Sequence, residues 1–339
     1  MMNNILPALP TEKIPAKSNG YFFTLHEAMW RLDKNNNISV GMIHDLLDPE
    51  TLSGFLHTLS FYARNLSAAY TRHIFLCFLD MIRATKATRI DDIMLIGYRS
   101  SLDAAHEHEL ACVSVLLRKW HKLGYPGVSK NVACLLEGWR LKGGRKGDAV
   151  KRLDPLKGPL TDNELQAFNE AVVRAYEKSL ITIAELAMAL SVSHTGRRSI
   201  QISQLRVVDI LCGENEKGEP FYVLNVPRAK QLWAVLSAQA RNAVTLVENR
   251  LGIELQEADR QQIPLFPDLD VLATIQSPYE FYQLLATDKL HIAASVITKT
   301  LHLIVEESDI RSERTGDLLH INSRRFRYTT GTRAARGIP

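Results

Sequence analysis

Two short stretches, far apart in the chain, place arginines beside glycine and threonine. The first is TGRRSIQISQLRVVDI (195–210), in which Gly196 precedes Arg197 and Arg198, and a helical segment then leads toward a strand. The second is RRFRYTTGT (324–332), which begins with three arginines in four positions. A guanidinium group can bind phosphate oxygens with forked hydrogen bonds, so both stretches are candidates for phosphate binding.

Positive charge is concentrated in two segments, although the net charge of the 339-residue chain is only +4. Residues 140–158 carry seven Lys/Arg and two Asp, a local charge of +5. Residues 311–339 carry seven Arg against one Glu and one Asp, again +5. This distribution indicates a polyanionic partner, but two solvated basic loops would give the same pattern.

Composition is that of a globular protein, with 46% hydrophobic and 23% charged residues, and the length allows two domains. We find no run of 18 apolar residues and no signal peptide, so the sequence predicts no membrane partner. The histidines of HEHE (106–109) are two positions apart and would not share a helix face, so we expect a surface helix there and no metal site. The cysteines are widely spaced in apolar stretches, which predicts buried thiols in a reducing compartment and neither disulfides nor a zinc site. They are Cys77, Cys112, Cys134 and Cys212.

Changes in patterning divide the chain into four parts. Residues 1–50 are predicted to be an N-terminal arm, and residues 51–139 a helical domain with apolar side chains at three- and four-residue spacing. The glycine-rich, basic stretch 140–158 is the predicted linker. The second domain, 159–339, begins with a capping box formed by Thr161 and Glu164, and is predicted to be mostly helical with a small sheet around FYVLNVP.

The first arginine stretch resembles the first arginine box of the tyrosine recombinase (phage integrase) family. That box reads Gly-x-Arg-x-x-Glu-(apolar)-x-x-Leu and is followed by an Asp-(apolar) pair. Arg198 matches the first catalytic arginine. Gln201 replaces the usual glutamate, whose carboxylate would hold a guanidinium more firmly than an amide. The other positions in register are Gly196, Ile202, Leu205, Asp209 and Ile210.

The second stretch resembles the family's His-x-x-Arg-His-Thr-x-Ala-Thr box. Arg327 matches the second catalytic arginine, with Thr329 and Thr332 also in register. Arg324 stands where the family has its first histidine, and Tyr328 replaces the second. Arginine does not exchange protons near neutral pH, so a general-base role would be lost at Arg324 while phosphate binding would be kept.

Between its two boxes the family has a lysine on a β-hairpin. YVLNVPRAKQ places Lys230 in this interval, just after a predicted strand, with Arg228 as the alternative. LTDNEL (160–165) resembles the start of the family's catalytic domain, and the helices of 51–139 resemble its core-binding domain. The resemblance therefore extends over nearly all of the chain after residue 50.

The resemblance implies a mainly α fold with a small β-sheet. A helical core-binding (SAM-like) domain would be followed by a mixed α/β catalytic domain, and the two would close around duplex DNA. It also implies self-association of subunits on DNA, a cytoplasmic, nucleoid-associated location, and no cofactor or metal. We expect the basic linker to follow the DNA backbone; the alternative is a flexible tether only. The linker residues expected to bind DNA are Arg140, Lys142, Arg145, Lys146, Lys151 and Arg152.

In this family a tyrosine attacks the scissile phosphate and forms a 3′-phosphotyrosyl link. Two arginines stabilise the charge that develops on the phosphate oxygens, and a lysine protonates the leaving 5′ oxygen. The nucleophile and a preceding His or Trp follow the second box. The chain stops seven residues after Thr332, so we expect it to be truncated before the nucleophile and inactive in cleavage. Tyr279 and Tyr282 precede the box, and Tyr328 is adjacent to Arg327.

Two other functions remain open from the sequence. The chain could be a non-catalytic DNA-binding module that keeps the recombinase fold but lost its nucleophile in evolution. A metal-dependent nuclease is disfavoured, because the sequence has no clustered carboxylates to hold the metal.

Overall fold

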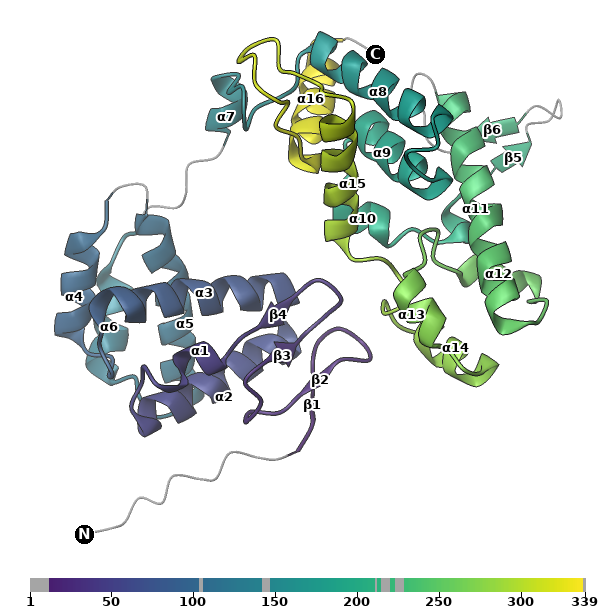
Figure 1. Cartoon of the computed structure of the whole chain (residues 1–339). Helices are drawn as coiled ribbons and strands as arrows, with labels where there is room; N and C mark the ends of the chain where they lie inside the picture. Colours follow the sequence, from purple (N-terminus) through teal and green to yellow (C-terminus); the bar gives the residue numbers. More distant parts are fainter. Residues whose placement is uncertain are drawn as a thin grey trace. The chain divides into compact units, whose positions relative to one another are not determined.

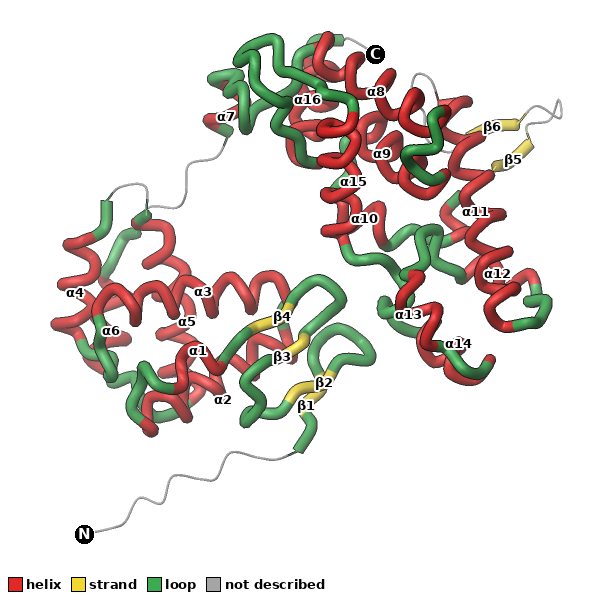
Figure 2. The backbone as a smooth tube through the Cα atoms, in the orientation of Figure 1, coloured by secondary structure: helices red, strands yellow, loops and turns green. Residues whose placement is uncertain are grey.

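The computed structural model describes residues 12–103, 106–141, 147–210, 212–214, 220–222 and 229–337. The chain forms two compact units, 1–146 and 147–339, which run from purple to blue and from teal to yellow in Figure 1. Helices contain 61% of the residues and strands 5%, which confirms the predicted mainly α class with little β-structure (Figure 2). The described strands form three separate two-stranded antiparallel sheets.

The N-terminal segment of the first unit is part of its core, and the predicted arm over 1–50 is therefore wrong for residues 21–47. Two small antiparallel pairs, β1 with β2 and β3 with β4, contribute Phe23 and Trp30, which stack with ring centroids 4.4 Å apart. Trp30 is fully buried in the same apolar cluster as the helices that follow. Burial of such aromatic surface outweighs the local polar character of this segment. The strands are β1 (Ile14–Pro15), β2 (Phe22–Phe23), β3 (Trp30–Arg31) and β4 (Asn37–Ile38).

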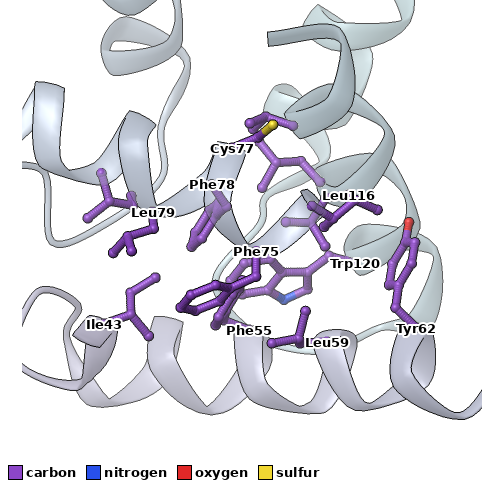
Figure 3. Close-up of a cluster of buried hydrophobic side chains, with 14 of the residues drawn as sticks. Ile43, Phe55, Leu59, Tyr62, Phe75, Cys77, Phe78, Leu79, Leu116 and Trp120 are labelled. Atoms are coloured by element: carbon purple, nitrogen blue, oxygen red, sulfur yellow. The ribbon is translucent and has the colours of Figure 1, made fainter. Parts of the chain in front are cut away.

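The helices of the first unit pack around aromatic side chains. Phe55 stacks on Phe78 with centroids 4.4 Å apart, and Trp120 lies against both rings (Figure 3). Capping side chains start four of the helices, and at α6 the hydroxyl of the N-cap residue Ser129 accepts from the Val132 N–H. The helices are α1 (Gly41–His44), α2 (Pro49–Asn65), α3 (Ala68–Thr85), α4 (Asp92–Ser101), α5 (Glu107–Leu123) and α6 (Lys130–Gly138).

The second unit is built around helix α9 (Ile183–Thr195), which is buried along most of its length. Its neighbours are α8 (Asp162–Glu177), α11 (Ala229–Leu251), α15 (Ala294–Glu307) and α16 (Ser323–Ala335). The predicted capping box at the start of α8 is confirmed: Thr161 Oγ1 accepts from the Glu164 N–H, and Glu164 Oε2 accepts from the Thr161 N–H. A helix apolar on nearly every side is stable only when others surround it, which explains the central place of α9.

The remaining elements of the second unit lie around this bundle. A smaller apolar cluster includes Val247, Phe281 and Leu290, and packs the segment after α11 against that helix. The predicted strand FYVLNVP corresponds to β6 in its first residues, and its last residues lie outside those described. The elements are α7 (Asp148–Lys151), α10 (Ser199–Ser203), a 3₁₀ helix (Val207–Asp209), β5 (Cys212–Glu214), β6 (Pro220–Tyr222), α12 (Glu257–Gln262), α13 (Leu269–Thr274) and α14 (Pro278–Leu285).

Part of the predicted linker 140–158 is folded onto the second unit. Residues 147–158 belong to that unit, and two of their backbone carbonyl groups contact side chains of the segment before α16. Leu153 O accepts from Arg314 Nη1 at 3.0 Å, and Leu156 O lies 2.9 Å from His320 Nδ1. The linker prediction is therefore wrong for 147–158, because these carbonyl groups are paired with the unit that follows.

Candidate functional site

The first arginine box begins where the central helix α9 ends. Gly196 adopts a left-handed conformation with φ 60°, and its N–H donates to Val192 O at 3.0 Å. A Cβ atom built on Gly196 would lie 2.8 Å from Thr330 Oγ1 and 3.1 Å from Arg327 Cα. The glycine is thus required both for its backbone conformation and for the close approach of α16. The two boxes therefore meet here, and Arg327 forms a hydrogen bond to Gly196, which lies 131 residues earlier in the chain.

Arg198 is the N-cap residue of α10, two positions after this glycine. Its backbone N–H donates to Gln201 Oε1 at 3.1 Å, while its side chain is exposed. Gln201 therefore fixes the backbone of Arg198, and not its guanidinium as the family's glutamate was expected to do. The Arg198 side chain thus extends into solvent, while a hydrogen bond to Gln201 holds its backbone in place.

Helix α16 places two more arginines beside this position. Arg324 and Arg327 are three residues apart and so share a helix face. Arg324 is exposed and Arg327 half-buried, with its Nε donating to Gly196 O at 3.2 Å. Burial lowers the pKa of Arg327, and the positive charges of Arg198 and Arg324 lower it further, against an opposing effect of Tyr328. Three arginines predicted from two boxes thus lie within electrostatic reach of one another.

The charge of this group is not neutralised within the described part of the chain. None of the ion pairs there involves Arg198, Arg324 or Arg327, although the same unit pairs other arginines with carboxylates. Arginine keeps its charge at neutral pH even where its pKa is lowered. We call Arg198, Arg324 and Arg327 the arginine cluster. Its excess positive charge favours an anion, and the forked donors of arginine suit a phosphate.

For the predicted catalytic lysine, Lys230, the structure describes only the backbone. Lys230 is the second residue of α11, a helix that packs on α9, and its side chain lies outside the described residues. The alternative, Arg228, also lies outside them. The catalytic role of Lys230 stays a prediction.

Sequence reasoning missed Arg325, which lies between two members of the arginine pattern and is fully buried. Its Nε donates to Gly158 O at 2.9 Å, its Nη1 donates to His320 O, and its Nη2 lies 3.5 Å from Glu164 Oε2. Burial lowers the pKa of Arg325, with the Glu164 charge opposing. Arg325 therefore anchors α16 to the start of α8. In the sequence, the apolar neighbour Phe326 was the only local indication that this side of the helix is buried.

Glu164 is the acceptor at the centre of this anchor. Besides capping α8, its buried carboxylate accepts from Ser312 Oγ at 2.5 Å and from Arg314 Nη2 at 2.9 Å. A buried carboxylate with two arginines and a hydroxyl has its charge and hydrogen-bonding capacity satisfied. The network fixes α16 and thereby the positions of Arg324 and Arg327.

The box threonines have structural contacts. Thr329 Oγ1 accepts from the Leu160 N–H at 2.8 Å and donates to Arg325 O at 2.9 Å. Thr332 Oγ1 donates to Tyr328 O at 2.6 Å within the helix. Thr329 thus helps to hold α16 against the segment that precedes α8.

The predicted DNA-binding residues of the basic stretch are only partly described. Arg140 is exposed just after α6 in the first unit. Lys151 and Arg152 are exposed at the end of α7 in the second unit. The other three, Lys142, Arg145 and Lys146, lie outside the described residues.

Comparison of the chain with protein-family models, curated proteins and solved structures gives no match. Among the described residues, no helix is long and apolar enough to cross a membrane.

Proposed function

We propose that this protein binds duplex DNA and that its arginine cluster contacts one backbone phosphate. The observation that carries the proposal is the meeting of two distant arginine boxes at the end of α9, where Gly196 O accepts from Arg327 Nε. Three guanidinium groups without a carboxylate partner among the described residues form a site suited to a phosphate with several charged oxygens. Exposed Arg140, Lys151 and Arg152 would add contacts to neighbouring phosphates.

The resemblance of both boxes supports a more specific proposal, site-specific DNA recombination of the tyrosine recombinase type. In that chemistry Arg198 and Arg327 stabilise the charge that develops on the non-bridging phosphate oxygens. Lys230 would protonate the leaving 5′ oxygen, and a tyrosine would form the 3′-phosphotyrosyl link. Such subunits would self-associate on paired DNA sites.

A second candidate, a DNA-binding protein without cleavage activity, is favoured by one residue. Arg324 occupies the position of the family's first histidine, and arginine cannot act as a general base near neutral pH. It still binds phosphate, so the substitution preserves affinity for DNA at the expense of proton transfer.

The phosphate site is tested by fluorescence anisotropy with a labelled duplex and the variants Arg198→Ala, Arg324→Ala and Arg327→Ala. Each variant should weaken binding roughly tenfold or more, because a hydrogen bond to a charged group contributes about 1.5–3 kcal/mol. The double variant of Arg198 and Arg327 should lose less than the product of the single losses, because residues that share one partner are energetically coupled.

The matched control is Arg174→Ala, which removes an exposed arginine of the same unit that is paired with Glu170 at 3.4 Å. It should leave affinity within about twofold, as expected for a surface ion pair. Equal losses in Arg174→Ala and the cluster variants would contradict a specific phosphate site.

The two functions are separated by incubation of the protein with a nicked suicide duplex, followed by denaturing electrophoresis. A slow-migrating covalent protein–DNA band supports recombination. Binding without this band, in both the Arg324 protein and Arg324→His, supports the non-catalytic function. A band that forms only with Arg324→His identifies the arginine as the reason that cleavage was lost.

A further inference from the structure

Three potential metal ligands meet where helices α3 and α5 pack in the first unit. The side chains are His73 and Cys77 on α3 and Cys112 on α5, and their ligand atoms all lie within 4.8 Å of one another. Cys77 Sγ is 3.8 Å from both ring nitrogens of His73. The two thiol sulfurs fall within the same 4.8 Å limit. This cluster is separate from the arginine cluster, which belongs to the second unit.

Helix geometry explains how the three side chains come together. His73 and Cys77 are four residues apart and therefore lie on one face of α3. That face packs against α5, which supplies Cys112. Because 35 residues separate the two cysteines and no Cys-x-x-Cys motif is present, the sequence predicted isolated buried thiols and no zinc site.

The spacing approaches that of a tetrahedral zinc site. Bond lengths of about 2.3 Å to sulfur and about 2.05 Å to nitrogen put tetrahedral ligand atoms roughly 3.6–3.8 Å apart. The Cys77 sulfur is 3.8 Å from the ring nitrogens of His73, at the upper end of this range. Two thiolates and an imidazole are ligands that zinc prefers over calcium or magnesium.

The burial of the three side chains leaves the cluster open to the solvent on one side. Cys77 is buried, Cys112 half-buried and His73 exposed, so an ion can enter from the solvent side. Figure 3 shows the Cys77 sulfur at the edge of the aromatic cluster, away from the rings of Phe55 and Phe75.

We propose that His73, Cys77 and Cys112 bind a zinc-class divalent cation, with water in the fourth position. Binding displaces one proton from each thiol, so the metal gains two Cys sulfur bonds and one His nitrogen bond while two protons pass to solvent. No electron is transferred. The ion would tie α3 to α5 and stabilise the first unit.

The test uses the full chain after reduction and removal of metal with a chelator. Zn²⁺ is titrated in competition with a chromophoric chelator, and Co²⁺ serves as a spectroscopic probe. We expect one equivalent per chain, a thiolate-to-cobalt charge-transfer band, intense tetrahedral d–d bands, and a zinc-dependent rise in the unfolding temperature.

The variants are His73→Asn, Cys77→Ser and Cys112→Ser, with Cys134→Ser as the matched control, because Cys134 is an exposed cysteine outside the cluster. Each cluster variant should lose at least about tenfold in zinc affinity, since loss of even an outer-sphere partner costs about 10–100-fold. His73→Asn and Cys112→Ser change side chains that are not fully buried, so they test the site even if Cys77→Ser fails to fold.

Two results would overturn the proposal. One is equal zinc affinity in His73→Asn, Cys112→Ser and Cys134→Ser. The other is an absent thiolate-to-cobalt band in the fully reduced protein, together with a Cys77–Cys112 disulfide in peptide mapping of the untreated protein.

Discussion

At the scale of single residues, helix α16 gives neighbouring arginines different surroundings. Successive helical residues are rotated by about 100° around the helix axis, so Arg324 and Arg325 cannot face the same way. Arg324 is exposed, Arg325 is fully buried against Gly158 and Glu164, and Arg327 turns back toward α9. Of these three arginines, Arg325 anchors the helix, while Arg324 and Arg327 have no carboxylate partner among the described residues.

Gly196→Ala should destabilise the second unit and weaken DNA binding. An alanine at φ 60° costs about 1–2 kcal/mol, and its Cβ would also displace Thr330 and the backbone of Arg327. Because α16 would shift, the arginine cluster would lose its geometry. Denaturant unfolding followed by circular dichroism measures the first effect, and fluorescence anisotropy with duplex DNA measures the second.

The matched control is Gly252→Ala, since Gly252 also follows a helix, has φ 65° and would place its Cβ in open space. It should show only the backbone cost and unchanged affinity for DNA. Equal losses of affinity in the two variants would mean that the approach of α16 to Gly196 does not shape the site.

At the scale of elements, two helices of the second unit begin with the same local motif but have different surroundings. Thr161 with Glu164 starts α8, and Thr182 with Glu185 starts α9. Glu164 is also the buried partner of Arg314 and Arg325, whereas Glu185 bonds only within its own capping motif among the described residues. The start of α8 is therefore a junction for α16.

Glu164→Gln should cost about 3–5 kcal/mol, because it leaves the buried Arg325 without a compensating charge. Glu185→Gln should cost at most about 1 kcal/mol, because an amide oxygen can still cap a helix. Denaturant unfolding compares the two variants. Similar costs would contradict the role of Glu164 as the anchor of α16, and a double-mutant cycle with Arg325→Met would show whether the two residues are coupled.

At the scale of the whole molecule, two units with separate cores share the chain. The boundary lies between Lys146 and Gly147, inside the predicted basic stretch. Arg140 therefore belongs to the first unit and Lys151 to the second. Each unit carries positive charge next to the boundary, as expected if both contact one polyanion.

Affinity for duplex DNA should fall steeply with salt, and neutralising Arg145, Lys146, Lys151 and Arg152 together should flatten that dependence. Each phosphate contact contributes about 0.9 to the slope of log affinity against log salt concentration. Loss of all four contacts would therefore lower the slope by roughly 3–4. Anisotropy titrations at several salt concentrations measure it.

The control neutralises Arg174 and Lys178, two exposed residues at the far end of α8, and should change the slope little. An unchanged slope in the fourfold variant would remove these four residues from the DNA interface.

The sequence by itself determined the features that depend on neighbours within a few residues. The capping box of Thr161 and Glu164 could be predicted, because capping hydrogen bonds connect residues two to four positions apart. The two arginine boxes were visible as residue types and spacings.

Only the tertiary structure decided which of these residues meet. The burial of Trp30 in the first core, the inward turn of Arg325 and the folding of 147–158 onto the second unit depend on surfaces supplied by distant segments. The approach of Cys112 to His73 and Cys77 likewise requires the packing of α5 on α3. Burial of apolar area and pairing of buried polar groups are properties of the whole fold, so local periodicity cannot specify them.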